Sequence, residues 1–129
     1  MTTFIPINYK KKWANIYILV GVICVLIFSL GYFIVNDFMI LVYSIASIVP
    51  IYFGYKMKKS PYALVSKSNI EVFGLFGELK YEYICTAGSK FINRENKIFL
   101  IEKNKTTRIK MNKWFVNQAD WNAVLDLFD

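Results

Sequence analysis

Two long apolar segments near the N-terminus constrain this chain more than any other feature. Residues 14–35 and residues 38–55 carry no charged side chain. As α-helices they would be about 33 Å and about 27 Å long, close to the roughly 30 Å hydrocarbon core of a bilayer. Only Asn36 and Asp37 separate the two segments. The chain must therefore turn there, and we predict two antiparallel helices that form a membrane hairpin.

A cleaved signal peptide is the main alternative for the first segment. Its apolar stretch is longer than the roughly 7–15 residues of a signal sequence, and no small-residue cleavage site precedes the second segment. A single helix through both segments is disfavoured because Asn36 and Asp37 interrupt them. We therefore expect a transmembrane hairpin over residues 13–56, with helices at 14–35 and 38–55.

Lysine clusters flank both free ends of this predicted hairpin. They are Lys10, Lys11 and Lys12 on one side, and Lys56, Lys58 and Lys59 on the other. By the positive-inside rule, the N-terminal segment (residues 1–12) and everything after the hairpin are expected to be cytoplasmic, at a bacterial inner membrane. Trp13 lies beside the first cluster, where an amphipathic ring suits the membrane interface. Whether the lysines only set this topology or also bind anionic headgroups stays open.

The location of the charge argues against a nucleic-acid partner. The net charge is +7, yet residues 60–129 hold ten Lys/Arg against eight Asp/Glu. Six of the excess charges lie in the lysine clusters, whereas a nucleic-acid-binding domain concentrates basic residues on its own surface. The chain has no histidine, and we find no metal-binding cysteine pair or phosphate-binding glycine loop. We therefore predict a protein without enzymatic activity, cofactor or metal.

Residues 60–129 are predicted to form an α+β cytoplasmic domain. After residue 60 the hydrophobic period changes to two, and turn residues separate short alternating runs. The six expected strands cover residues 62–65, 70–73, 78–85, 90–93, 97–102 and 106–111. Residues 4–8 would add an edge strand, because Pro6 is tolerated only at an edge position.

The C-terminal segment is predicted to be a helix. Asn117 suits the N-cap position, and Asp120 places a carboxylate in the first turn, where it interacts favourably with the helix dipole. An apolar stripe then recurs at helical spacing and is expected to cover one face of the sheet. The residues predicted for the domain core are Leu79, Tyr81, Tyr83, Trp114, Trp121, Val124, Leu125 and Phe128.

Two stretches of the domain carry a pattern found in a known family. Residues 77–84 read Gly-Glu-Leu-Lys-Tyr-Glu-Tyr-Ile, and residues 108–112 with 117–121 form a final strand and a helix entry. In this layout the chain resembles small bacterial membrane proteins with a pleckstrin-homology-like (PH-like) domain, although Tyr81 stands where that family usually has tryptophan. The resemblance implies a transmembrane hairpin, followed by an antiparallel sheet of about six or seven strands capped by a C-terminal helix. It also implies a binding role without catalytic residues.

Two functions fit such a protein. It is either a tethered binding module, whose partners would be the bilayer and a protein, or an immunity protein that neutralises a toxin at the inner membrane. Small size, frequent Lys, Asn and Ile, and absent catalytic chemistry agree with the second function without being specific to it. A second copy of the chain is a further candidate partner.

Overall fold

The computed structural model describes residues 3–129 and divides them into two compact units. Residues 11–59 form a helical unit. Residues 60–129 form a β-rich domain that also includes residues 3–10. The short N-terminal segment is therefore part of the domain, although more than forty residues separate the two in the sequence.

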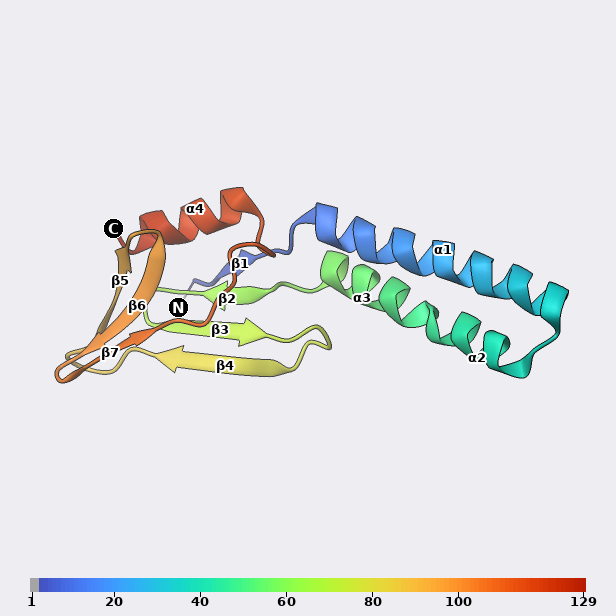
Figure 1. Ribbon diagram of the computed structural model, residues 1–129. Helices are drawn as coiled ribbons and strands as arrows, with labels where there is room; N and C mark the ends of the chain where they lie inside the picture. The colour runs from blue at the N-terminus through green and yellow to red at the C-terminus, as the bar shows by residue number, and fades with distance from the viewer. Residues whose placement is uncertain (1–2) are drawn as a thin grey trace. The chain divides into compact units, whose positions relative to one another are not determined.

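The helical unit is a hairpin, as the sequence predicts. Helix α1 (Lys11–Val35) leads into a turn, after which the chain returns through α2 (Phe38–Ala46) and α3 (Ile48–Lys59) (Figure 1). Asp37 is the N-cap of α2, and its carboxylate accepts a hydrogen bond of 2.9 Å from the backbone N–H of Met39. Helix α1 begins three residues earlier than predicted, and α3 extends four residues further.

The returning arm is interrupted at Ser47, where the sequence predicted one continuous helix. Pro50 explains the position of the break, because proline lacks a backbone N–H and its ring clashes with the carbonyl four residues earlier, here Ala46. The Ser47 hydroxyl donates a 2.8 Å hydrogen bond to the Tyr43 carbonyl. The two pieces together still span 22 residues.

Small residues let the two arms of the hairpin approach closely. Gly21 and Gly54 are both buried, and a Cβ atom added at Gly54 would lie only 2.6 Å from the carbonyl oxygen of Ala14. Nearer the turn, the hydroxyl oxygens of Ser29 and Ser44 lie 2.8 Å apart and share a hydrogen bond between the helices. Gly54 thus belongs to the contact face between the two arms.

The domain contains seven antiparallel strands in two sheets, where the sequence predicted one sheet. The first sheet has the order β1-β2-β3-β4 and the second the order β5-β6-β7 (Figure 1). The strands are β1 (Ile5–Ile7), β2 (Ala63–Val65), β3 (Asn69–Phe73), β4 (Leu79–Ile84), β5 (Lys90–Arg94), β6 (Lys97–Glu102) and β7 (Lys105–Arg108). Within residues 3–129, β4 and β5 are consecutive but unpaired, and the segment between them includes Gly88, whose φ is +87°.

Strand β1 lies at the edge of the first sheet, as predicted. It pairs with β2, so that Ile5 lies opposite Val65 and Ile7 opposite Ala63. Beyond the strand, the backbone N–H of Asn8 donates a 2.9 Å hydrogen bond to the Asp120 carboxylate of the C-terminal helix. The N-terminal segment is thus tied to both a strand and a helix of the domain.

Helix α4 (Gln118–Leu127) closes the domain. Its N-cap is Asn117, as predicted, because the Asn117 side chain accepts a hydrogen bond of 3.0 Å from the Ala119 N–H. The helix packs against β1. Just beyond the helix, the ring centroid of Phe128 lies 5.4 Å from that of Phe91 in β5. The buried core includes Trp121, Val124 and Leu125 of this helix, and Tyr81, Tyr83 and Phe128 pack at its margin.

Two residues predicted for the core lie outside it. Leu79 is 52% exposed because the register between β3 and β4 shifts at Val72 and Phe73, which breaks the alternation that would have placed Leu79 beside Tyr81. Trp114 is 68% exposed because it lies in a turn and not on a strand. The structure corrects the prediction for both residues.

Tyr9 and Tyr62 form a buried aromatic pair between the N-terminal segment and the domain. Their rings meet edge to face, with centroids 5.3 Å apart, and the Tyr62 hydroxyl accepts a 2.8 Å hydrogen bond from the Asn112 N–H. The pKa of Tyr9 is raised to about 12, mainly by burial of its hydroxyl and to a smaller extent by the nearby charges that Tyr62 and Glu78 can carry.

The pKa of Tyr9 predicts a loss of stability at high pH. The unfolded chain releases this proton near pH 10, whereas the folded domain retains it until about pH 12. Since the unfolded state then binds fewer protons, the free energy of unfolding should fall as the pH rises from 10 to 12. Urea unfolding across this range should show a weaker decline for Tyr9→Phe than for the parent. If the free energy of unfolding falls equally in Tyr9→Phe and the parent, the decline does not arise from the raised pKa of Tyr9.

Candidate functional site

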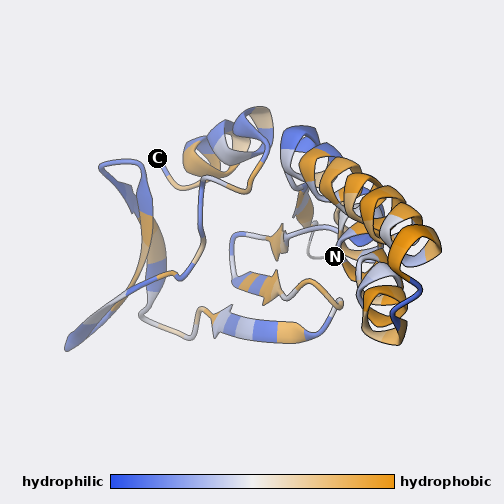
Figure 2. Ribbon diagram, turned by 45° about the vertical axis from the view of Figure 1, so that its right-hand side comes forward, coloured by the Kyte–Doolittle hydropathy of each residue, from blue (hydrophilic) through white to orange (hydrophobic). Residues whose placement is uncertain are grey.

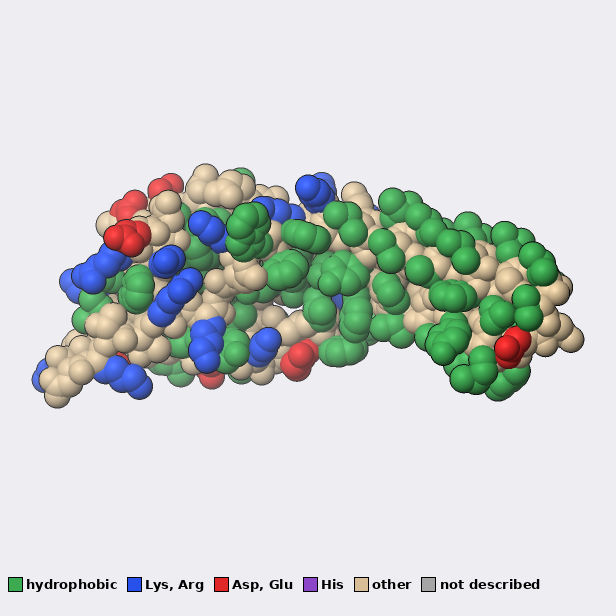
Figure 3. Space-filling view, in the orientation of Figure 1, with side chains coloured by type: hydrophobic (Ala, Val, Ile, Leu, Met, Phe, Trp, Pro, Cys, Tyr) green, Lys and Arg blue, Asp and Glu red, His purple; other side chains and the backbone are tan. Residues whose placement is uncertain are grey.

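The outer surface of the hairpin is apolar on all sides. Within residues 3–129, 25 large apolar side chains are exposed, and all but five of them lie between Ile16 and Tyr55. Figure 2 shows that hydrophobic residues predominate along α1, α2 and α3, and Figure 3 shows apolar side chains gathered over the visible face of the hairpin. A soluble protein rarely exposes so large a contiguous apolar patch. Both arms are long and apolar enough to cross a membrane.

The C-terminal end of the hairpin combines lysines with tyrosines. Lys56 and Lys59 lie over the rings of Tyr52 and Tyr55, with Nζ-to-centroid distances of 5.7 Å and 5.8 Å. These residues and Lys58 occupy the last turns of α3, where positive charge complements the helix dipole. The predicted cluster is therefore placed at a helix end beside two aromatic rings.

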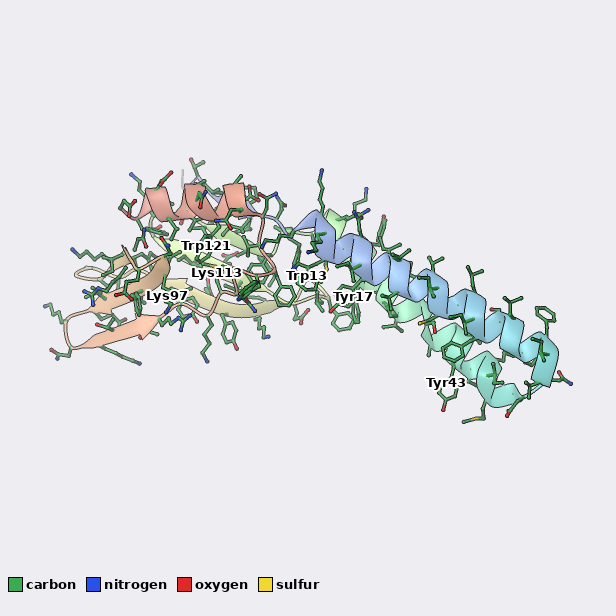
Figure 4. All side chains as sticks on the ribbon, turned by 45° about the horizontal axis from the view of Figure 1, so that its top comes forward. Trp13, Tyr17, Tyr43, Lys97, Lys113 and Trp121 are labelled. Carbon is green, nitrogen blue, oxygen red and sulfur yellow. The ribbon has the colours of Figure 1, made fainter. Side chains whose placement is uncertain are left out.

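The N-terminal end of the hairpin has the opposite electrostatics. Lys11 and Lys12 are exposed in the first turn of α1, which contains no acidic residue. Positive charge is unfavourable at a helix N-terminus. Helix stability therefore does not account for this cluster, whereas an anionic surface nearby would. Trp13, in the same turn, is half-buried (Figure 4).

The domain carries a pocket of about 260 Å³ along one side of α4. The helix contributes Gln118, Trp121, Asn122 and Leu125 at the spacing of a single face. The remaining lining residues are Lys10, Asn96, Lys113 and Trp114, so that two lysines and no carboxylate surround the opening. Figure 4 shows Trp121 and Lys113 close to each other. The pocket therefore has the charge of an anion-binding site.

One side chain of the pocket has an unused hydrogen-bond donor. Trp121 is 5% exposed, and its indole Nε1 atom is buried without an acceptor among residues 3–129. A buried donor left unpaired costs about 1–3 kcal/mol. Most of the indole belongs to the core, as predicted, but this donor gives Trp121 a second role as a candidate ligand contact.

Local turn geometry places the other lining residues. Asn96 is the second residue of the two-residue turn between β5 and β6, where both Glu95 and Asn96 have positive φ. Such a turn suits asparagine and the twist of a β-hairpin. Lys113 and Trp114 belong to a turn before α4, in which the Asn112 side chain accepts a 3.0 Å hydrogen bond from the Trp114 N–H.

Sequence reasoning missed this pocket. It treated Trp114 only as a core residue and gave Lys113 no role, since neither belongs to a periodic segment. One signal was available, because the dipeptide Lys-Trp occurs at residues 12–13, at the start of the apolar hairpin, and again at residues 113–114. The repeated pairing of a cation with an amphipathic ring is typical of membrane interfaces.

Comparisons of the chain with protein-family models, curated proteins and solved structures find no match. The candidate site therefore depends on its own geometry and chemistry. Among residues 3–129, no group of three His, Cys, Asp or Glu side chains is arranged to hold a metal ion.

Proposed function

We propose that this chain is an integral membrane protein of the bacterial inner membrane that holds a PH-like binding domain at the cytoplasmic face. The domain acts by binding and not by catalysis. Both the residues before α1 and those after α3 lie on the cytoplasmic side. The pocket beside α4 is the part of the domain that we assign to ligand binding.

The proposal is carried by one observation, the apolar hairpin with lysines at both free ends. The turn of the hairpin carries Asp37, and no acidic residue other than Asp37 occurs between Lys11 and Lys59. Helix α1 would be about 37 Å long, and α2 with α3 about 33 Å, which is sufficient to cross a hydrocarbon core of about 30 Å. The asymmetry of the lysines favours the orientation with both ends inside.

The PH-like assignment is supported by the arrangement of the domain. Seven antiparallel strands in two sheets are closed by one C-terminal helix. A binding role is also supported by a pocket that has cationic and apolar lining but no carboxylate for acid–base work. A protein partner at an exposed sheet edge is compatible with this role, since β1 and β4 are both edge strands.

The topology has a direct test in intact cells. A cysteine at Asn36, in a chain whose Cys24 and Cys85 are replaced by serine, should react with a membrane-impermeant maleimide from the outside. A cysteine at exposed Lys67 in the domain should react only after the cells are lysed. Labelling of position 67 in intact cells, or extraction of the protein by alkaline carbonate, would contradict the proposed function.

A further inference from the structure

We propose that the pocket beside α4 binds the phosphate-bearing headgroup of an anionic phospholipid, with Trp114 in the interfacial layer. This inference rests on the proposed membrane hairpin and deepens it. The ligand-binding groups are Lys10 and Lys113, and the buried, unpaired indole N–H of Trp121 belongs to a residue that lines the same pocket.

Hydrogen bonds tie one side of the pocket to residues 8–10, which directly precede α1 in the chain. The backbone N–H of Lys10 donates to the Phe115 carbonyl over 2.8 Å, and the N–H of Asn117 donates to the Asn8 carbonyl over 2.8 Å. Tyr9 and Val116 form a β-bridge between these two bonds. Residues 115–117 therefore run alongside residues 8–10.

Lys10 directly precedes Lys11, the first residue of α1. Consecutive Cα atoms are about 3.8 Å apart, so the pocket lysine lies one residue from the point where the chain enters the helix. If α1 crosses the bilayer, its first turn lies at the interface. Lys10, and the turn bonded to it, must then lie at the depth of the lipid headgroups.

The chemistry of the pocket matches a phosphate diester with a polar organic substituent. Two ammonium groups can meet phosphate oxygens, and amide side chains can meet hydroxyl groups. The volume of 260 Å³ equals that of about nine water molecules in the liquid, which exceeds the need of a bare phosphate. A glycerophosphate headgroup uses both the charge and the remaining space.

The exposure of Trp114 supports a bilayer source for this ligand over a soluble one. Its indole is 68% exposed next to Lys113, whereas an apolar ring with one polar N–H is stabilised where lipid meets water. A soluble phosphate ester would give this ring no apolar environment. An acidic protein segment would use the same lysines, but it would not require their position beside the start of α1.

The test uses the full chain in nanodiscs, with 5-fluorotryptophan at all three tryptophans. A lipid that carries a spin label on its headgroup should broaden the ¹⁹F signals of both Trp13 and Trp114. Raising the fraction of phosphatidylglycerol in phosphatidylcholine should shift the Trp121 signal in a saturable manner. Lys10→Gln and Lys113→Gln should each raise the half-saturating fraction about fivefold, as expected for one basic residue at an anionic surface.

Lys105→Gln is the matched control, because Lys105 is exposed on β7 and does not line the pocket. It should leave the half-saturating fraction unchanged. The headgroup inference would be overturned if the Trp13 signal were broadened and the Trp114 signal were not, or if the Trp121 signal did not shift with phosphatidylglycerol. Either result would leave the proposed membrane hairpin intact. If neither Trp13 nor Trp114 is broadened, the proposed function itself is wrong. A Trp121 shift with soluble glycerol 3-phosphate alone would assign the pocket to a soluble ligand.

Discussion

Replacing Gly54 with alanine is expected to force the two arms of the hairpin apart. The added Cβ atom would lie 2.6 Å from the carbonyl oxygen of Ala14 and 2.6 Å from Cγ1 of Ile18. The Ile18 side chain has some freedom to rotate away, whereas the Ala14 carbonyl belongs to the backbone of α1. Relief of this contact therefore requires a shift of one helix against the other.

Two opposing effects decide the sign of this change. Alanine has a higher helix propensity than glycine, worth about 1 kcal/mol in favour of the variant. Overpacking a tight contact costs about 1–3 kcal/mol, and the cost is highest when the opposing atom is backbone. Close approach of helices at small residues is also what stabilises pairs within a bilayer. We therefore expect the hairpin of Gly54→Ala to be less stable than the parent hairpin.

Gly31→Ala provides a matched control in the same hairpin. A Cβ at Gly31 would meet Cγ2 of Ile40 at 3.5 Å, which is ordinary van der Waals contact. Spin labels at exposed Asn15 and Lys58 report the separation of the arms in a nanodisc. The distance distribution should move to longer values and broaden in Gly54→Ala, but stay at the parent value in Gly31→Ala. Equal distributions in both variants would show that Gly54 does not set the contact.

The hairpin was predictable because its determinants are local. Uncharged runs, a two-residue polar break and flanking lysines are all contiguous in sequence, and the structure places the helices and the turn between them where these signals predict them. The interruption at Ser47 lies just before Pro50, which leaves the Ala46 carbonyl without its usual N–H donor.

The domain was predictable in its elements but not in their assembly. Alternation and turn residues located the strands to within a few residues, and Asn117 located the start of α4. The division into two sheets depends on which strands fail to pair, and the exposure of Leu79 depends on a register shift between β3 and β4. Neither feature leaves a periodic signal. The pocket was missed for the same reason, since it joins residues from positions 10, 96, 113 and 121.

Ile7→Ala is expected to destabilise the domain by about 2–5 kcal/mol, the range for truncating a fully buried isoleucine. Ile7 is 0% exposed and belongs to the same core cluster as Val65 and Val124, although it lies before the hairpin in the sequence. A small domain has a free energy of unfolding near the lower end of about 5–15 kcal/mol. Truncation of one side chain in a three-residue edge strand should therefore remove much of the stability of the domain, although the rest of the domain begins more than fifty residues later in the sequence.

Pulse proteolysis of the full chain in detergent measures this loss of stability. At each urea concentration, the fraction of the domain that stays uncleaved gives the folded fraction. Phe4→Ala is the control, because Phe4 is the larger side chain in the same segment but is 37% exposed and lies outside β1. Ile7→Ala should lower the urea midpoint at least twice as much as Phe4→Ala does. If the urea midpoint of Ile7→Ala equals that of the parent, the segment before the hairpin does not contribute to the stability of the domain core. That result would also remove the ladder that holds Lys10 beside Phe115, and with it the physical basis for a headgroup site at the start of α1.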